Sequence, residues 1–150
     1  MEPLTAGSAA PVIEGIDPPS VPGVLFFYKV TCPVCQMAAP MVQSFQRGYS
    51  GRIAGIGQDP PPVLEDFGRT FGWTFPWISD APPYPVSDAF GVRVVPTAFL
   101  LDGDRTVLDA VEAWDREGLN RISLRLAEMI EAPYVPISEE GDGLPPFRPG

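Results

Sequence analysis

Residues 24–35 read V-L-F-F-Y-K-V-T-C-P-V-C, and this stretch decides the fold. Its first part, residues 24–30, is a nearly continuous run of apolar, β-favouring residues, which is typical of a strand buried on both faces of a parallel sheet. From Pro33 the apolar spacing becomes that of an amphipathic helix, with a stripe formed by Val34, Met37, Ala38, Met41, Val42 and Phe45. Thr31 or Cys32 would start that helix. The sequence therefore predicts a strand-to-helix junction at the two cysteines.

The rest of the chain alternates between strand and helix patterns. The expected elements are an edge strand at 11–16, a buried strand at 52–57, a helix at 62–71, an extended piece at 75–78, a Pro-rich loop at 81–85, a hairpin of 96–101 and 105–110 around Asp102-Gly103-Asp104, and a helix at 116–130. Asp115 is available as the cap of the last helix. This order predicts an α/β three-layer domain, in which a central mixed sheet carries helices on both faces.

Composition sets the expected domain boundaries. The chain has 150 residues, including 20 prolines and 15 glycines, and this length suits one domain. We expect residues 11–130 to form that domain after a flexible N-terminus at 1–10. Residues 131–150 are rich in proline, glycine and acids, and this composition predicts a mobile tail.

Charge and hydropathy limit the partners and the location. The net charge is −9 and the sequence pI is about 4.3. Nucleic-acid binding needs a basic surface that displaces counterions, so an acidic chain whose one lysine is Lys29 argues against that partner. The longest apolar stretch, 24–28, is far too short to span a bilayer, and the first residues lack the pattern of a secretory signal. We expect a cytoplasmic protein that binds neither nucleic acid nor membranes, unless an export signal was removed.

The two cysteines are the candidate reactive groups. The chain has no histidine, which excludes Ser/His/Asp and Cys/His catalysis and His-ligated zinc. Cys32 and Cys35 are spaced C-x-x-C, with the first at the predicted helix start. Unpaired N–H groups and the helix dipole stabilise a thiolate there, and a residue three positions later lies on the same helix face. We expect Cys32 to attack a disulfide and Cys35 to resolve the mixed disulfide, with no metal and no organic cofactor.

Two separate motifs resemble thioredoxin-fold proteins. The stretch 24–35 is similar to their active-site segment, and G-V-R-V-V-P-T-A-F-L-L-D-G-D at 91–104 is similar to the segment that carries their cis-proline. G-Q-D-P from Gly57 and S-D-A-F-G-V from Ser87 favour the TlpA-type thiol-disulfide reductases and the peroxiredoxin relatives within this group. The resemblance covers about residues 10–130 and implies a thioredoxin-like fold.

The resemblance also implies roles for residues beside the cysteines. It implies that Pro96 is cis, that the Val95 backbone pairs with an extended substrate strand next to Cys32, and that Thr97 begins the following strand. The supporting active-site loop would consist of Thr31, Pro33 and Val34. The sequence departs from the family at two positions. Thr31 stands where a tryptophan is common, and Phe26 stands where thioredoxins carry a buried acid, so no carboxylate can be assigned to the Cys35 proton.

The expected activity has two alternatives. Thiol-disulfide exchange would use a disulfide-containing protein or small molecule as substrate and a separate electron donor, which the sequence does not identify. A hydroperoxide reductase is the first alternative, although the peroxiredoxin pattern P-x-x-x-T-x-x-C, aligned on Cys35, meets Tyr28 and Cys32. The second is a non-enzymatic binding module that holds a partner through residues 95–97 or through a zinc ion shared by two chains.

Overall fold

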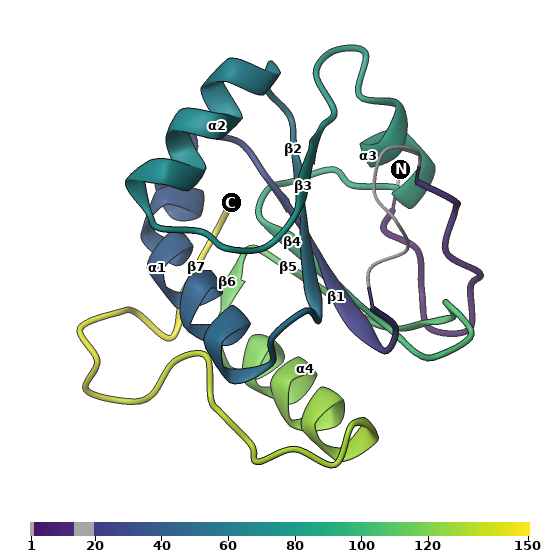
Figure 1. Ribbon diagram of the computed structural model, residues 1–150, viewed down its shortest axis with the longest axis vertical. Helices are drawn as coiled ribbons and strands as arrows, with labels where there is room; N and C mark the ends of the chain where they lie inside the picture. The colour runs from purple at the N-terminus through teal and green to yellow at the C-terminus, as the bar shows by residue number, and fades with distance from the viewer. Residues whose placement is uncertain (1, 14–19) are drawn as a thin grey trace.

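The computed structural model describes residues 2–13 and 20–150 and is built around one five-stranded sheet (Figure 1). The strands are β1 (Gly23–Tyr28), β2 (Ile53–Gly57), β3 (Trp77–Ser79), β4 (Thr97–Leu101) and β5 (Val107–Glu112). Their order in the sheet is β3-β2-β1-β4-β5. The β1–β2 and β2–β3 pairs are parallel, whereas β1–β4 and β4–β5 are antiparallel. The sheet is therefore mixed, as predicted.

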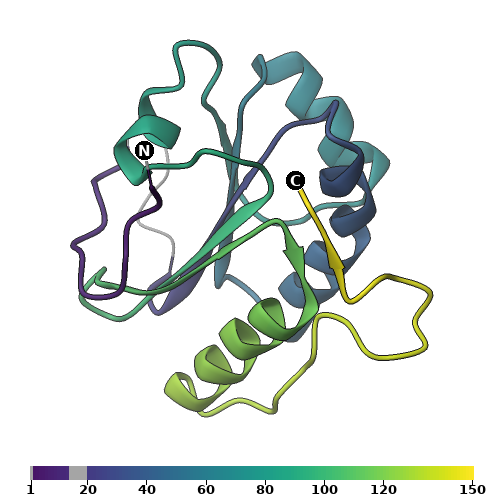
Figure 2. The same cartoon turned by 180° about the vertical axis from the view of Figure 1, so that it is seen from behind.

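Helices cover both faces of this sheet (Figures 1 and 2). They are α1 (Pro33–Gly48), α2 (Pro61–Thr70), α3 (Pro85–Phe90) and α4 (Arg116–Met129). Side chains of α1, α2 and α4 build the larger apolar cluster on one face, and α3 joins the smaller cluster on the other. The predicted α/β three-layer, thioredoxin-like architecture is confirmed.

The central strand β1 explains why the sequence run there is almost continuously apolar. Every residue of β1 is buried. Val24, Phe26 and Tyr28 enter the larger cluster, while Leu25 and Phe27 enter the smaller one on the opposite face. Because successive side chains of a strand point to opposite faces, both sets must be apolar when both faces are covered.

The main difference from the predicted elements lies between β3 and β4. The Pro-rich loop was expected to end at Pro85, and no helix was predicted after it, but α3 begins there. The Asp80 carboxylate stabilises the first turn of this helix, because it accepts hydrogen bonds from the Val86 and Ser87 amides at 2.9 and 2.7 Å. A six-residue helix is too short to show a helical period in the sequence.

The N-terminal segment follows the outer side of β5. Val107 exchanges backbone hydrogen bonds with this segment, receiving one from Gly7 and donating one to Ser8, both at 2.8 Å. The Ala10 amide donates to the Arg105 carbonyl at 2.9 Å. Of the expected edge strand at 11–16, residues 14–16 lie outside the described residues, and residues 11–13 are not assigned to a strand. Flexibility of residues 1–10 stays a prediction, but the described part of this segment is paired with the sheet.

The last twenty residues, 131–150, fold back over the domain, and we call them the C-terminal strap. Ala132, Val135, Ile137 and Leu144 of the strap pack against the larger cluster. The strap ends in β7 (Phe147–Arg148), which pairs antiparallel with the short β6 (Trp114–Asp115). Composition predicted a tail outside the domain. The strap instead packs on it, because widely spaced apolar residues reach the core between the prolines. Its mobility stays a prediction.

Candidate active site

The first turn of α1 places the two cysteines together. Cys32 is the N-cap residue of α1, with an extended backbone (φ −81°, ψ 116°), and Pro33 follows in the first turn. A proline is tolerated there because its missing N–H would have no partner within the helix. The Cys35 amide donates a hydrogen bond to the Cys32 sulfur at 3.3 Å. The Cys32 sulfur therefore lies at the positive end of the helix dipole.

The two sulfurs differ in their access to solvent. Cys32 is partly exposed, whereas Cys35 has 0% exposure, and both are free cysteines. Burial raises the pKa of the Cys35 thiol well above its usual range, and the hydrogen bond with Cys32 and the nearby Asp59 charge raise it further. Cys32 is therefore the more accessible of the two residues, and burial favours the neutral thiol of Cys35.

A second chain segment reaches the cysteines through the antiparallel pairing of β1 with β4. In this pairing Phe27 lies opposite Thr97, so the start of β4 is next to the end of β1. The Cys32 thiol lies 3.6 Å from the Val95 carbonyl oxygen and donates to it. The Val95–Pro96 peptide bond is cis. The structure thus brings Val95 and Pro96 beside Cys32, although they are more than sixty residues away in the sequence.

Hydrogen bonds hold the segment around Pro96 in place. The Thr97 hydroxyl donates to the Val94 carbonyl at 2.7 Å, and the Ala113 amide donates to the Pro96 carbonyl at 2.8 Å. Pro96 and Thr97 are buried, whereas Val95 is partly exposed. Of these three residues, Val95 is therefore the one that stays partly exposed beside Cys32.

Hydrogen bonds with the side chains of Asp59 and Gln36 hold the loop that precedes α1. The Val30 amide donates to the Asp59 carboxylate at 2.9 Å, and the Val30 carbonyl accepts a hydrogen bond from the Gln36 side chain at 2.8 Å. Thr31 and Pro33, which follow, are exposed, whereas Val34 is buried in the larger cluster. Thr31 and Pro33 lie on the surface beside Cys32, and Val34 anchors the loop to the core.

Phe26 occupies the position at which thioredoxins carry a buried acid. The carboxylate near the cysteines is that of Asp59, which follows β2. Phe26 stacks on Tyr28 with ring centroids 5.8 Å apart. The Tyr28 hydroxyl is buried and has no hydrogen-bond partner among the described residues. Burial raises the pKa of Tyr28 well above its usual range, and the charges of Asp59 and Cys35 add to the shift. Asp59 thus acts electrostatically on both buried groups.

Asp59 lies outside the motifs that predict the site, although the sequence holds one signal for it. Asp59 follows β2, which is the parallel neighbour of β1. Carboxyl ends of parallel strands meet at the same edge of a sheet, and the cysteines follow β1 at that edge. A polar residue just after β2 is therefore expected near the cysteines. Lys29, by contrast, directs its ammonium group to Tyr84, 3.4 Å from the hydroxyl and 5.5 Å from the ring centroid.

The fold and this pair of free cysteines at a helix N-terminus define a thioredoxin-fold redoxin. The chain belongs to the AhpC/TSA family, whose sequence profile matches residues 18–110. No curated protein sequence matches it.

Solved structures place the chain among thioredoxin-like proteins. DsbF of Mycobacterium tuberculosis, solved in mixed oxidised and reduced forms, is 28% identical, with a TM-score of 0.54 over 61% of this chain and 69% of that one. A secreted M. tuberculosis disulfide oxidoreductase, described as homologous to E. coli DsbE, is 21% identical, with the same TM-score and coverage. A putative thiol:disulfide interchange protein DsbE from Chlorobium tepidum is 21% identical, with a TM-score of 0.60 over 71% of this chain and 84% of that one. The last two likenesses show the fold alone.

Within the part of the chain that the structure describes, no helix combines the length and the apolar character needed to cross a membrane.

Proposed function

We propose that the protein is a thiol-disulfide oxidoreductase in which Cys32 attacks and Cys35 resolves. The observation that carries this proposal is the 3.3 Å hydrogen bond from the Cys35 amide to the Cys32 sulfur at the start of α1. This contact places the Cys32 sulfur at the N-terminal end of α1 and keeps the second cysteine within one helical turn. The difference in exposure supports the order of the two roles, because an external disulfide meets Cys32 first.

The proposed reaction moves two electrons to the substrate in two exchange steps. The Cys32 thiolate attacks one sulfur of the substrate disulfide. That S–S bond breaks, the first substrate thiolate leaves and takes a proton from water, and a mixed disulfide forms. Cys35 then loses its proton to water and attacks the Cys32 sulfur. The mixed disulfide breaks, the second substrate thiol leaves with a proton, and a Cys32–Cys35 disulfide remains for a dithiol donor to reduce.

The remaining residues of the proposed site position the substrate. The Val95 backbone would pair with the chain on either side of the substrate disulfide, with Pro96 and Thr97 holding it beside Cys32. Thr31 and Pro33 would line the approach to the sulfur, and Val34 would keep the loop fixed to the core. The substrate class is a disulfide-containing protein or small molecule, and the electron donor is a dithiol.

Insulin reduction with dithiothreitol as electron donor tests this function. The native chain should accelerate the reduction, and Cys32→Ser should abolish the acceleration. Cys35→Ser should still attack, so mass spectrometry should find it as a stable mixed disulfide with one insulin chain. Equal rates for the native chain and Cys32→Ser would refute the assignment.

Membership in the AhpC/TSA family keeps hydroperoxide reduction as a second candidate. In that reaction the Cys32 thiolate would take one peroxide oxygen as a sulfenic acid and release water or an alcohol. The Cys35 thiol would then attack the sulfenic sulfur, whose hydroxyl leaves as water with the Cys35 proton, and the disulfide would form. Stopped-flow oxidation by hydrogen peroxide separates the candidates, because a rate no faster than that of free cysteine would remove this one.

We propose a cytoplasmic location, as the sequence predicts, while noting that one structural neighbour is described as secreted. Fractionation of the source cells, with the Cys35→Ser variant used to trap mixed disulfides, would identify the compartment and the partners in one experiment. Partners known to be exported would contradict the cytoplasmic assignment.

A further inference from the structure

The end of the C-terminal strap lies against the same carbonyl that faces Cys32. A Cβ built on Gly150 would collide with the Val95 carbonyl oxygen and lie 3.0 Å from its carbon atom. The Cys32 thiol donates to this oxygen at 3.6 Å. The Val95 carbonyl therefore has the reactive sulfur and the strap as neighbours.

We propose that the strap determines substrate selection, by covering the Val95 backbone so that small disulfides react with Cys32 more readily than disulfides in extended polypeptides. This inference rests on the proposed thiol-disulfide exchange. An extended polypeptide needs the Val95 backbone for pairing, so it must displace the strap end first. A small disulfide needs only access to Cys32, a residue that is partly exposed with the strap in place.

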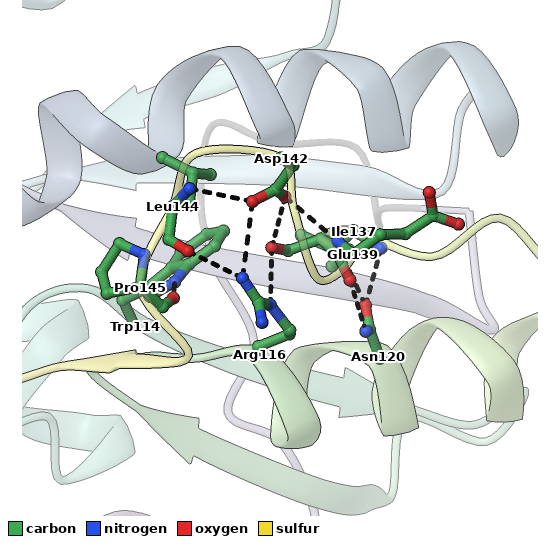
Figure 3. Close-up of polar contacts among 9 residues, drawn as sticks. Trp114, Arg116, Asn120, Ile137, Glu139, Asp142, Leu144 and Pro145 are labelled. Atoms are coloured by element: carbon green, nitrogen blue, oxygen red, sulfur yellow. Dashed lines mark hydrogen bonds and ion pairs between the residues drawn. The ribbon is translucent and has the colours of Figure 1, made fainter.

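The upstream part of the strap is anchored to the start of α4 (Figure 3). The Arg116 guanidinium donates to the Leu144 carbonyl at 2.7 Å and to the Ser138 hydroxyl at 3.0 Å, and it pairs with the Asp142 carboxylate at 3.4 Å. Asp142 also accepts hydrogen bonds from the Leu144 and Glu139 amides at 2.9 and 3.1 Å. These contacts fix where the strap turns back toward the cysteines.

Residues 113–116, which follow β5, hold the last part of the strap near Val95. Trp114 is fully buried, and its indole N–H donates to the Pro145 carbonyl at 2.7 Å. The Arg116 amide donates to the Pro146 carbonyl at 3.0 Å, and Arg148 lies opposite Trp114 in the β6–β7 pair. The Ala113 amide donates a hydrogen bond to the Pro96 carbonyl. Residues 113–116 are therefore linked directly to the segment that contains Val95.

Beyond these contacts with residues 113–116, few described contacts hold the end of the strap. Both residues of β7 are exposed, with Phe147 at 57%, and the Arg148 guanidinium reaches the Met37 sulfur at 3.9 Å. A two-residue strand without a buried side chain is the kind of element that opens locally without unfolding the domain. The strap end is thus firm enough to cover Val95 and weak enough for a well-matched polypeptide to displace.

A pair of double variants tests the proposal in the full chain. Phe147→Gly together with Arg148→Gly weakens β7 without touching the core, because both side chains are exposed. Glu131→Gly together with Glu140→Gly is the control, since both residues are exposed in the same strap and lie outside the Asp142 anchor. The assay compares kcat/KM for insulin with kcat/KM for glutathione disulfide.

The β7 variant should raise kcat/KM for insulin several-fold and leave the value for glutathione disulfide unchanged, and the control should change neither. An unchanged ratio of the two values in the β7 variant would overturn the inference and leave the proposed function intact. No turnover of either disulfide by the native chain would instead overturn the proposed function.

Hydrogen exchange gives a second readout that does not depend on turnover. The Arg116 amide is bonded to the strap at Pro146, so it reports whether the strap is seated. In the Cys35→Ser chain, a disulfide-linked peptide that extends along Val95 should make this amide exchange faster, whereas a glutathione adduct should not. Full protection with the peptide attached would contradict the proposal.

Discussion

The cysteine junction and the strap both reach the Val95 carbonyl, but different forces hold them there. The junction lies between β1, which is buried on both faces, and the buried side of α1. The upstream part of the strap is held by apolar contacts with the core and by polar contacts with α4, whereas its last residues, 146–150, are all exposed. A segment fixed by buried apolar surface moves only when the core opens, whereas one fixed by a few polar contacts can leave alone. The cysteines therefore stand on a part of the fold that is fixed by the core, and the end of the strap beside them is held by weaker contacts.

The largest contrast between the two regions is expected in stability. Phe27 of β1 is fully buried against Phe90 and Phe99, with ring centroids 5.3 and 5.5 Å away. Phe27→Ala should therefore lower the free energy of unfolding by about 3–5 kcal/mol. Phe147→Ala in the strap should change it by less than about 0.5 kcal/mol. Urea unfolding of both variants measures this difference. Similar losses in the free energy of unfolding would contradict the expected contrast between the junction and the strap.

Two tyrosine-to-phenylalanine substitutions should change the free energy of unfolding in opposite directions. The Tyr28 hydroxyl near the junction is buried without a hydrogen-bond partner among the described residues, so Tyr28→Phe should stabilise the protein by about 1 kcal/mol. The Tyr49 hydroxyl accepts hydrogen bonds from the Val135 amide at 2.7 Å and the Ser123 hydroxyl at 3.0 Å. Tyr49→Phe should cost about 1–3 kcal/mol and loosen the start of the strap.

Thermal unfolding of the two variants beside the native chain measures both effects. Destabilisation by Tyr28→Phe would show that its hydroxyl has a partner. No loss with Tyr49→Phe would show that the strap does not depend on this anchor.

The strap, unlike the junction, should respond to acid. Hydrogen bonds from the Ser138 hydroxyl and then the Leu144 amide hold the pKa of Asp142 below its usual range. Because the folded-state pKa is lowered, the contribution of this carboxylate is fully present above the ordinary aspartate pKa and is lost as the pH falls through the lowered value. Exchange of the Leu144 amide should accelerate over that acidic window. Asp142→Asn should exchange fast throughout, and a flat profile for the native chain would contradict this anchor.

The smallest expected effect concerns the junction itself. The Asp59 charge is one of the causes that raise the pKa of Cys35, after burial and the Cys32 hydrogen bond. Asp59→Asn removes this charge but keeps an oxygen that can accept the Val30 amide, so the pKa of Cys35 should fall by less than about one unit. The pH profile of mixed-disulfide resolution should move to lower pH by the same amount. Asp66→Asn on the exposed side of α2 is the control, and a shift to higher pH for Asp59→Asn would show that this carboxylate acts as a base.

The junction could be predicted from the sequence because its information is local. The apolar run of 24–30 and the helical spacing after Pro33 are visible in one window, and the structure places β1, the Cys32 cap and α1 there. The hairpin of β4 and β5 and the helix α4 with its Asp115 cap are encoded in the same way. Their ends differ from the expected ranges by only a few residues.

The strap contacts could not be predicted because their partners are distant in the sequence, and Asp59 could be found only by placing the predicted strands 24–30 and 52–57 side by side in one parallel sheet. Residues 131–150 have the composition of a free tail, but the guanidinium of Arg116 and the side-chain amide of Asn120 are among the distant groups that bind this segment to the domain. The Asn120 side chain accepts the Ile137 amide at 2.7 Å and donates to the Ser138 carbonyl at 2.7 Å. Asp59 reaches the junction only through the parallel pairing of β1 and β2. Single-sequence patterns do not carry such contacts.

The pairing of the N-terminal segment with β5 has a consequence for behaviour in crowded solution. β5 is an outer strand of the sheet, and an uncovered outer strand is a template on which another polypeptide can add by backbone hydrogen bonds. Gly7, Ser8 and Ala10 already occupy the bonding positions around Val107 and Arg105. At the opposite border, β3 has only three residues and offers little length for such addition. The first residues of the chain thus act as a guard against edge-to-edge aggregation.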